Sequence, residues 1–343
     1  MMGNPALSPG RLLITGVPGW LATALLNDLH HTALAGLQSV RALLHPASAP
    51  LAEELRRDFD VLSEIAYCDL GQPVDVDDAL AGVDTVLHSA AIIHVQQTQD
   101  WYRINTDGTI ALAKAARRAG VRRFVFISSN AAGGRARSFE DRLTEEIPAE
   151  PLSHYGKSKQ LAEDALLAMH EPDRFEVVIL RPSMFYGPPV PARHVDIYKR
   201  ILHGKMPMVG NGLYSRSITY IDHLVQACRL ALTHPGAGGE IFYIVDEQPY
   251  TTKAITDAMA TALGCKVSYI RLPSAIGPVC YLADRVLAAA GIYVQPLHLV
   301  GESTWHVGIS PAKAIRRLGY KPSVSLEEGM RRSIEWCRNK KLI

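Results

Sequence analysis

The chain has 343 residues, of which 48% are hydrophobic and 20% are charged. This apolar content supports a large core and excludes an intrinsically disordered chain. The 36 Lys and Arg against 34 Asp and Glu leave a formal net charge of +2. Because a strongly basic field is missing, nucleic acid is not an expected partner. The basic pairs Arg117-Arg118 and Arg122-Arg123 are interpreted as solvated surface near a helix end.

The spacing of the cysteines and the first residues of the chain indicate the cellular compartment to expect. Five widely separated cysteines without a C-x-x-C pair argue against a disulfide framework and against a zinc site, so no metal is expected. This pattern favours a reducing, cytoplasmic setting. Residues 1–10 lack the basic region and apolar core of a signal peptide. The apolar stretch 275–294 contains Asp284 and Arg285, which predicts an amphipathic helix rather than a membrane span.

Short aliphatic runs alternate with longer helical patterns through the first half of the chain. The expected strands cover residues 12–14, 40–44, 65–67, 83–88, 123–128 and 176–180, and a later strand covers 241–245. Strands separated by helices predict a parallel sheet, and continuous apolar strands fit a sheet covered on both faces. The predicted fold is therefore α/β, with a Rossmann-type doubly wound parallel sheet.

A Gly/Pro-rich run at residues 187–191 marks a change of organisation. We expect residues 1–186 plus about 219–250 to form the sheet domain. Residues 187–218 plus about 251–343 are expected to form a smaller, mostly helical, discontinuous lobe. In that lobe, Val279, Leu282, Val286 and Leu287 make an apolar helix face. This face is predicted to pack within the lobe, with a lid over a substrate as the alternative.

A glycine-rich turn follows the first strand and opens a helix expected from Leu21 to about His31. Gly16 and Gly19 would let the backbone approach a pyrophosphate, at which the N–H groups of the helix start would point. Tight turns also need glycine for backbone reasons, and Pro18 removes one donor. The position after the first strand of an alternating α/β chain nevertheless favours a dinucleotide site, which includes Pro18, Trp20 and Leu21.

Tyr155 and Lys159 are separated by four residues at the start of a predicted helix, so both lie on one face. There the ammonium is expected to lower the pKa of the phenol and make Tyr155 a general acid/base. A solvent-exposed pair is the alternative. Ser128 and Ser129 follow the strand 123–128, at the sheet edge where open α/β sheets bind ligands. Ser128 is expected to cap the strand end, and Ser129 to contact a substrate oxygen.

Several motifs in order resemble one family. They are Thr15–Ala22, His88–Ala91, Asn105–Thr109, Ser128-Ser129, Tyr155–Lys159, Arg181-Pro182 and Tyr186–Pro188, with Lys313–Tyr320 in the tail. Together they resemble the extended short-chain dehydrogenase/reductases, which include NAD-dependent epimerases/dehydratases and 3β-hydroxysteroid dehydrogenases. The resemblance implies that Ser129 is the catalytic hydroxyl and Tyr155 the proton donor/acceptor. Lys159 would tune Tyr155 and hold the nicotinamide ribose, and Asn105 would support a relay.

The same resemblance implies further contacts to NAD(P). Asp69 is expected to contact the adenine, although an Asp that ends a strand can also be a simple cap. Leu70, Ala90 and Pro182 complete the expected cofactor contacts. The second strand ends in Leu44-His45-Pro46 and lacks the carboxylate of NAD-preferring members. Arg41 and His45 are instead predicted to contact a 2′-phosphate, so we expect a preference for NADP(H).

The expected substrate is a small molecule, and the second half of the sequence resembles two branches of the family that act on different substrates. The segment after the sixth strand, with Ser183 and Tyr186, lacks the Asn of nucleotide-sugar epimerases and favours hydroxysteroid dehydrogenases and ketone reductases. The segment around Arg216 instead resembles the diphosphate-binding segment of nucleotide-sugar epimerases, dehydratases and 4-ketoreductases. Ser129, Ser183, Tyr186 and Arg216 are the expected substrate contacts. A catalytically silent sensor or scaffold is the non-enzyme alternative, and a homodimer is the default assembly.

Overall fold

The structure is a computed structural model that describes residues 7–73 and 75–343. Residues 1–6, on which the expectation of a missing signal peptide partly rests, lie outside the described part. All five cysteines lie inside it and are free thiols, as the spacing predicted. None of the helices in the described ranges has the length and apolar character that a membrane crossing requires.

Seven parallel strands form the central sheet, and each contains or overlaps a strand predicted from the sequence. They are β1 (Gly10–Val17), β2 (Leu37–Leu44), β3 (Leu62–Tyr67), β4 (Thr85–His88), β5 (Arg123–Ile127), β6 (Glu176–Pro182) and β11 (Glu240–Ile244). Their order is β11-β6-β5-β4-β1-β2-β3. The winding direction reverses between β1 and β4, so this is the point at which a doubly wound sheet binds its ligand.

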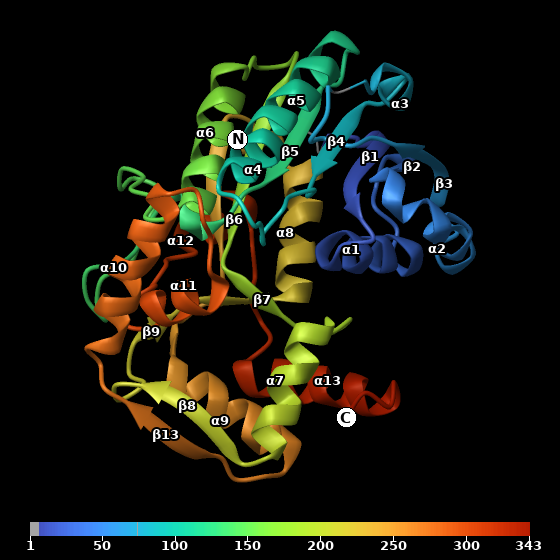
Figure 1. The fold of residues 1–343 in the computed structure, drawn as a ribbon. Helices are drawn as coiled ribbons and strands as arrows, with labels where there is room; N and C mark the ends of the chain where they lie inside the picture. The colour runs from blue at the N-terminus through green and yellow to red at the C-terminus, as the bar shows by residue number, and fades with distance from the viewer. Residues whose placement is uncertain (1–6, 74) are drawn as a thin grey trace.

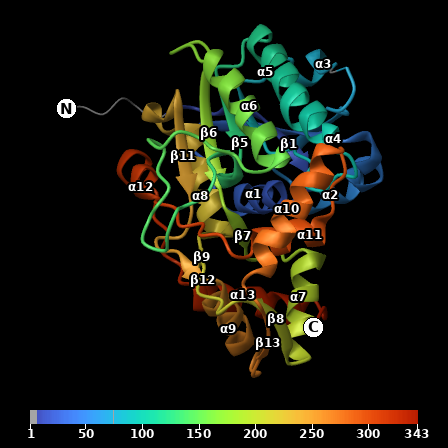
Figure 2. The same ribbon diagram turned by 60° about the vertical axis from the view of Figure 1, so that its left-hand side comes forward.

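The two faces of the sheet carry separate apolar cores because side chains alternate along each strand. Leu12 and Ile14 join the core beneath α1 (Trp20–His31) and α8 (Ile221–Thr233). Leu13 joins the opposite core, beneath α5 (Thr109–Arg118) and α6 (His154–Ala168). Both figures show these helices around the sheet (Figures 1 and 2). The predicted Rossmann-type architecture is confirmed.

Shorter elements complete this part of the molecule. They are α2 (Ala52–Asp58), α3 (Asp77–Leu80), α4 (Gln99–Trp101), a π-helix (Tyr102–Gly108) and 3-10 helices at Pro46–Leu51, Asn130–Ala132 and Pro235–Ala237. One expected surface residue is buried here: Arg123, at the start of β5, is 3% exposed. Its guanidinium pairs with Glu176, the first residue of β6, and donates to backbone carbonyls. The interpretation of Arg123 as solvated surface is therefore wrong.

The remaining elements follow β6 in the chain and lie in the middle and lower parts of Figure 1. Three pairs of short strands are β7 (Met184–Tyr186) with β10 (Ile218–Tyr220), β8 (Lys205–Val209) with β13 (Ser268–Leu272), and β9 (Ser215–Arg216) with β12 (Tyr250–Thr251). The helices are α7 (Ala192–Leu202), α9 (Thr252–Leu263), α10 (Ile276–Ala289), α11 (Gln295–Glu302), α12 (Ala312–Leu318) and α13 (Leu326–Asn339). Lys313 and Arg317 of α12 pair with Glu240 of β11. The division of the chain into sheet domain and lobe remains a prediction.

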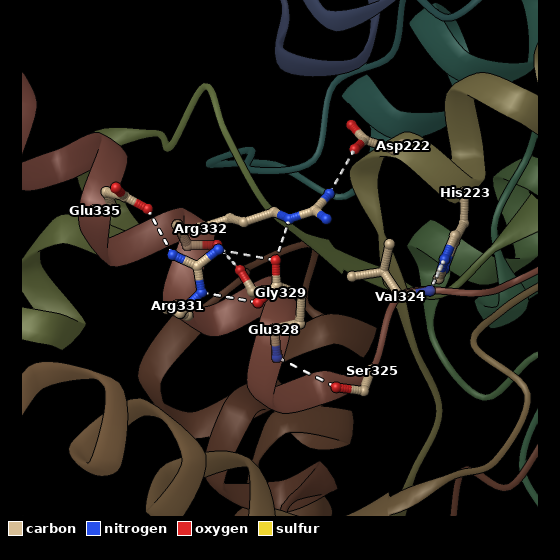
Figure 3. Close-up of polar contacts among 10 residues, drawn as sticks. Asp222, His223, Val324, Ser325, Glu328, Gly329, Arg331, Arg332 and Glu335 are labelled. Carbon is tan, nitrogen blue, oxygen red and sulfur yellow. Dashed lines mark hydrogen bonds and ion pairs between the residues drawn. The ribbon is translucent and has the colours of Figure 1, made fainter.

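The last helix is tied to α8 by two contacts (Figure 3). The backbone N–H of Val324 donates to Nε2 of the buried His223 at 3.0 Å. Arg332 of α13 lies 3.8 Å from the carboxylate of Asp222 and donates to Glu328 at 2.7 Å. These contacts hold the C-terminal helix against a helix that covers the sheet.

The apolar face of α10 points outward. Val279, Leu282 and Val286 are 65%, 65% and 64% exposed. The opposite side of the helix packs on α11, where Asp284 is buried and accepts a hydrogen bond from His298 Nδ1 at 2.8 Å. The prediction that this apolar face packs within the lobe is therefore wrong for these three residues. On the packed side, Asp284 pairs with His298 and the Tyr281 ring contacts Trp305.

Candidate active site

The glycine-rich turn bends tightly against the end of β4. Gly16 has φ +86°, and a Cβ there would lie 2.7 Å from Ser89 Oγ and 2.8 Å from Ala90 N. A Cβ on Gly19 would lie 2.5 Å from the Gly16 carbonyl oxygen. Side chains are excluded at both positions, so the backbone at the start of α1 is open to a close-approaching anion. This cradle fits the pyrophosphate of a dinucleotide, with Ala90 beside the turn.

The residues that follow the turn have different surroundings. The Pro18 carbonyl accepts a hydrogen bond from Thr23 at 3.1 Å, and Leu21 is buried in the core. Trp20 packs on Phe185 and His194, with ring centroids 4.7 and 5.0 Å apart. Trp20 therefore joins the helix start to the segment that follows β6. Its predicted contact with the cofactor stays a prediction.

His45 and Asp69 meet at the carboxyl ends of β2 and β3. The Nδ1 atom of His45 accepts from the Ala47 backbone N–H at 3.1 Å, so the neutral imidazole carries its proton on Nε2. That Nε2 lies 3.7 Å from Asp69 Oδ1, which also accepts from the Gly71 N–H at 2.8 Å. The structure thus brings together two predicted cofactor residues that are 24 positions apart in the numbering.

Arg41 points away from this edge. Its guanidinium donates to Glu64 at 2.6 Å and to the carbonyls of Ala79 and Ala81 at 2.6 and 3.1 Å. Arg41 shares a strand face with Leu43, which packs in the core that includes α3. These contacts occupy its donors and do not support the predicted contact with a 2′-phosphate. His45 is the member of that predicted pair that lies at the carboxyl edge.

A serine cap sets the position of the predicted Tyr155 and Lys159 pair. The Ser153 Oγ accepts from the Gly156 N–H at 3.1 Å and begins α6 there. One turn of α6 therefore separates Tyr155 from Lys159. Tyr155 is half-buried, and Ser129 lies close enough to its phenol to affect its pKa. The structure thus brings Ser129, Tyr155 and Lys159 to one place at the end of β5.

Of the two serines after β5, Ser129 and not Ser128 makes the capping hydrogen bond. Ser129 is the cap, since its Oγ accepts from the Ala131 N–H at 3.2 Å. Ser128 Oγ is buried and meets no hydrogen-bond partner among the described residues. The prediction that Ser128 caps the strand end is wrong because neighbouring side chains of an extended chain point in opposite directions, and only Ser129 faces the turn.

Lys159 is 1% exposed. Its Nζ donates to the Ile127 carbonyl at 2.8 Å and lies 4.1 Å from the centroid of the Phe126 ring. Burial lowers the pKa of Lys159 to about 7, whereas the carboxylate of Glu163 raises it. The ammonium is therefore poised to change charge near neutral pH.

The pKa of Tyr155 departs from the prediction. Burial raises the pKa of this phenol, and the neighbouring Ser129 hydroxyl lowers it by a smaller amount. The predicted decrease caused by Lys159 is not found, because the ammonium donates to the Ile127 carbonyl and desolvation of the phenolate dominates. Tyr155 is thus a neutral phenol at neutral pH, which is the protonation state of a proton donor.

Asn105 is fully buried in the π-helix. Its amide oxygen accepts from the Ile92 N–H at 2.8 Å, and its amide nitrogen donates to the Ile92 carbonyl at 2.9 Å. The same nitrogen lies 3.5 Å from Ser158 Oγ. Asn105 therefore ties the segment after β4 to the helix of Tyr155, while its relay role stays a prediction. Nearby, Leu70 is buried, and a Cβ on Gly108 would lie 2.4 Å from its carbonyl oxygen.

His88 was not predicted as a site residue, although it lies in one of the family motifs. It ends β4 fully buried, with Nδ1 2.7 Å from Thr15 Oγ1 and Nε2 2.9 Å from Thr109 Oγ1. Its ring stacks on Phe126 at 5.7 Å. Burial and the charge of Lys159 lower the pKa of His88 to about 3, so the imidazole is neutral. Glu163 was also missed, although its position four residues after Lys159 was a usable signal.

The predicted substrate residues after β6 turn inward. Ser183 donates to the Ser217 carbonyl at 2.6 Å, and Tyr186 donates to Asp246 at 3.1 Å. Both residues are buried. Their hydroxyls are used inside the protein, so these contacts do not support a direct substrate role. Pro182 is buried as well and pairs with Ile244 in the sheet.

Arg216 in β9 is engaged by α11. Its Nη2 donates to the Glu302 carbonyl at 2.7 Å. Burial lowers the pKa of Arg216, and the nearby Glu302 carboxylate raises it. An internal acceptor and an internal carboxylate thus already compensate this cation, which was the expected diphosphate contact.

The segment between α10 and α11 reaches the site through an aromatic chain. Trp101 lies between Tyr155 and Tyr293, with ring centroids 6.4 and 4.8 Å away. The Thr98 N–H also donates to the Gly291 carbonyl at 3.1 Å. Residues 291–293 thereby pack on the segment of Trp101, which in turn contacts Tyr155, and sequence spacing could not reveal this neighbourhood.

Residues 12–244 match the model of the NAD dependent epimerase/dehydratase family. The chain belongs to this family. The UDP-glucose 4-epimerase of Vibrio cholerae is 29% identical over 334 residues, which cover 95% of each chain. The 3-beta-hydroxysteroid dehydrogenase of Mycolicibacterium neoaurum is 28% identical over 353 aligned positions, which cover 96% of this chain and 92% of that protein.

The fold agrees with a solved member of the family. The dTDP-glucose 4,6-dehydratase DesIV of Streptomyces venezuelae, determined with NAD and TYD bound, has a TM-score of 0.76 and 25% identity, over 96% of this chain and 98% of that chain. This family member is therefore an extended short-chain dehydrogenase/reductase enzyme, as the motifs indicated, rather than a silent sensor or scaffold. Its glycine cradle fits the cofactor on which the family depends.

Proposed function

We propose that this enzyme interconverts a secondary alcohol and a ketone on a medium-sized substrate, with NAD(P) as the redox partner. The observation that carries the proposal is the convergence of Ser129, Tyr155 and Lys159 at the carboxyl end of β5. A hydroxyl, a neutral phenol and a buried ammonium are the groups needed to bind a carbonyl oxygen and supply its proton. The bound nicotinamide would supply the hydride.

In this mechanism, the residues of the chain handle the substrate oxygen and its proton. Ser129 positions the oxygen, and Tyr155 donates a proton to it during reduction or accepts one during oxidation. Lys159 binds the ribose and offsets the negative charge that Tyr155 acquires when it gives up its proton. Gly16 and Gly19 hold the pyrophosphate, and Asp69 and His45 lie at the edge that would hold the adenosine.

A ketone or alcohol without a diphosphate is the substrate class that we propose. Support comes from Arg216, whose guanidinium is compensated by Glu302 and its carbonyl. The aromatic wall of Trp101 and Tyr293 beside Tyr155 suits an apolar substrate body. A likeness to the 3-beta-hydroxysteroid dehydrogenase points the same way.

A nucleotide-sugar reaction, namely 4-epimerisation, dehydration or 4-ketoreduction, is the second candidate. The segment around Arg216 favours it, as do the likenesses to an epimerase and a dehydratase of nucleotide sugars. In that case Arg216 would have to leave the Glu302 carbonyl and bind the diphosphate.

The test is a substrate screen with the purified protein and both cofactors. Steroid alcohols and smaller cyclic and alkyl ketones form one panel, and UDP- and dTDP-sugars form the other. Cofactor absorbance reports net redox, and product analysis reports epimerisation or dehydration. Turnover of the first panel supports the proposal, whereas turnover of nucleotide sugars alone replaces it with the second candidate.

We also propose a preference for NADP(H), which now depends on His45 and the missing carboxylate after β2. His45→Asp should shift the preference toward NAD, because a carboxylate binds the ribose diol and repels a 2′-phosphate. Calorimetric titration of both cofactors into both proteins decides this point. Tighter binding of NAD+ by the wild type would contradict the preference.

A cytoplasmic location, a homodimeric assembly and a substrate-binding role for the lobe also remain predictions.

A further inference from the structure

A second buried charge cluster adjoins the catalytic residues. Glu163 of α6 and Arg181 of β6 are 1% and 4% exposed. They form a two-pronged ion pair, with Arg181 Nε 2.9 Å from Oε1 and Nη2 2.5 Å from Oε2. Arg181 Nη1 also donates to the Tyr243 hydroxyl at 3.2 Å. Both prongs and the tyrosine fix the carboxylate in one orientation.

Helix geometry places this carboxylate beside the catalytic lysine. Glu163 follows Lys159 by four residues on α6, so the two side chains lie on the same face. Lys159 is surrounded by few compensating groups: the Ile127 carbonyl, the Phe126 ring, the neutral His88 and the phenol of Tyr155. Glu163 is the anion that acts on Lys159, and Arg181 is the cation bound to that carboxylate.

We propose that Glu163 is a positioning residue that maintains the ammonium form of Lys159, with Arg181 as the clamp that holds the carboxylate in place. A buried ion pair alone is a poor source of stability, since desolvation offsets most of its attraction. A fixed anion beside a buried lysine has a separate effect, because it favours the charged state of that lysine. The consequence for catalysis rests on the proposed function, in which Lys159 must be charged.

The sign of the effect is set by electrostatics. Burial already lowers the pKa of Lys159 to about 7, and Glu163 opposes this decrease. In Glu163→Gln the anion is lost and its partner Arg181 is left uncompensated, and both effects disfavour the ammonium. The pKa of Lys159 should fall by about one unit or more.

The direct test is an NMR titration of the full-length protein with ¹³Cε-labelled lysine, without cofactor or substrate. The Lys159 signal is identified by its loss in Lys159→Arg. Glu163→Gln should move the Lys159 midpoint to lower pH by about one unit or more. An unchanged midpoint in a folded Glu163→Gln protein overturns the proposal, and this outcome does not depend on whether the enzyme reduces ketones.

The chain offers a matched control at the other end of β6. Arg123 and Glu176 form a second buried pair, with Arg123 Nε 3.0 Å from Glu176 Oε2. Glu176→Gln removes another arginine–glutamate pair that also involves β6 but leaves the surroundings of Lys159 intact. Its Lys159 midpoint should equal that of the wild type. An equal shift in both variants would mean that a general loss of packing moves the lysine, and would overturn the proposal.

A conservative variant covers the possibility that Glu163→Gln does not fold. Glu163→Asp keeps the charge but withdraws it by one methylene, so the Lys159 midpoint should lie below that of the wild type by a smaller amount. No shift in this variant overturns the proposal.

The affinity for NADPH and NAD+, measured from pH 5.5 to 9, is a functional readout. As the pH rises, this affinity should begin to weaken at a lower pH in Glu163→Gln than in wild type, because Lys159 loses its charge earlier. Loss of that difference with a shifted Lys159 midpoint would count against the assigned role of Lys159, not against Glu163.

Discussion

Two arginine–glutamate pairs lie buried at opposite ends of β6, and their settings differ. At the amino end, Arg123 binds Glu176 and donates to the carbonyls of Ala231 and His234, both at 2.9 Å. At the carboxyl end, Arg181 binds Glu163. Outside its ion pair, Arg123 donates only to backbone carbonyls, whereas the second pair adjoins the helix face of Lys159. The same ion-pair chemistry therefore joins two strands at one end and, in our proposal, maintains the charge of Lys159 at the other.

The difference follows from the geometry of parallel sheets. Loops at the carboxyl ends open onto the ligand site, whereas the amino ends only close the core. Changes at the carboxyl end should therefore alter chemistry and proton binding, and changes at the amino end should alter stability alone.

The largest expected effect is at Tyr155. Tyr155→Phe should lower turnover of a true substrate by about 10²–10⁴-fold, because only the proton-carrying hydroxyl is removed. Cofactor binding and the thermal midpoint should stay near those of the wild type. Steady-state kinetics and calorimetric cofactor titration measure both effects. Near-normal turnover would show that the active-site assignment is wrong.

Removing either arginine should destabilise the fold strongly. Arg181→Met leaves the buried carboxylate of Glu163 without its partner, at a cost of about 3–5 kcal/mol in the free energy of unfolding. The cost of Arg123→Met should be somewhat smaller, because the Glu176 side chain is 15% exposed. Urea unfolding measures this cost. Turnover is then measured as a function of pH at a temperature where both variants are folded. Arg181→Met should change this pH profile, and Arg123→Met should keep the wild-type profile. A changed profile in Arg123→Met would break the distinction between the two ends.

Acid stability should depend on His88. Its pKa is about 3 in the folded protein against an ordinary 6.5, so the unfolded chain binds one more proton between these values. Stability should therefore fall as pH drops from 6.5 toward 3, with a slope of about 1.4 kcal/mol per pH unit from this group. Urea unfolding at several pH values measures the slope. His88→Asn should reduce it clearly.

The control for this slope lies at the amino end. His234, next to Arg123, is only partly buried, and burial and the nearby arginines lower its pKa. His234→Asn should change the slope much less than His88→Asn. Equal changes in both variants would contradict the assignment of acid sensitivity to the buried imidazole beside Lys159.

The smallest expected effect is at Arg216. With a free ketone as substrate, Arg216→Ala should change kcat/KM by less than about tenfold, because the guanidinium is bound to α11 and not to substrate. A larger loss confined to KM for a nucleotide sugar would favour the second candidate function. Lys253→Ala, which removes an exposed cation of α9 paired with Asp257, is the matched control for charge.

Local patterns determined much of this protein. The seven strands, the helix after the glycine-rich turn and the face shared by Tyr155 and Lys159 all follow from periodicity and short spacing. Gly16 and Gly19 were found for the same reason, since a turn between a strand and a helix constrains residues that are close in the chain. Ordered motifs then indicated the family.

Tertiary structure decided what depends on distant partners and on burial. Arg41 reaches carbonyls of α3, Arg216 reaches Glu302, and Lys159 donates to Ile127, contacts that join residues far apart in the sequence. The raised pKa of Tyr155 and the exposed face of α10 also depend on which surfaces meet in the folded chain. The sequence predicts that such groups exist and roughly which face of an element carries them. Only the packing of one element on another determines which partner each group meets and whether water reaches it.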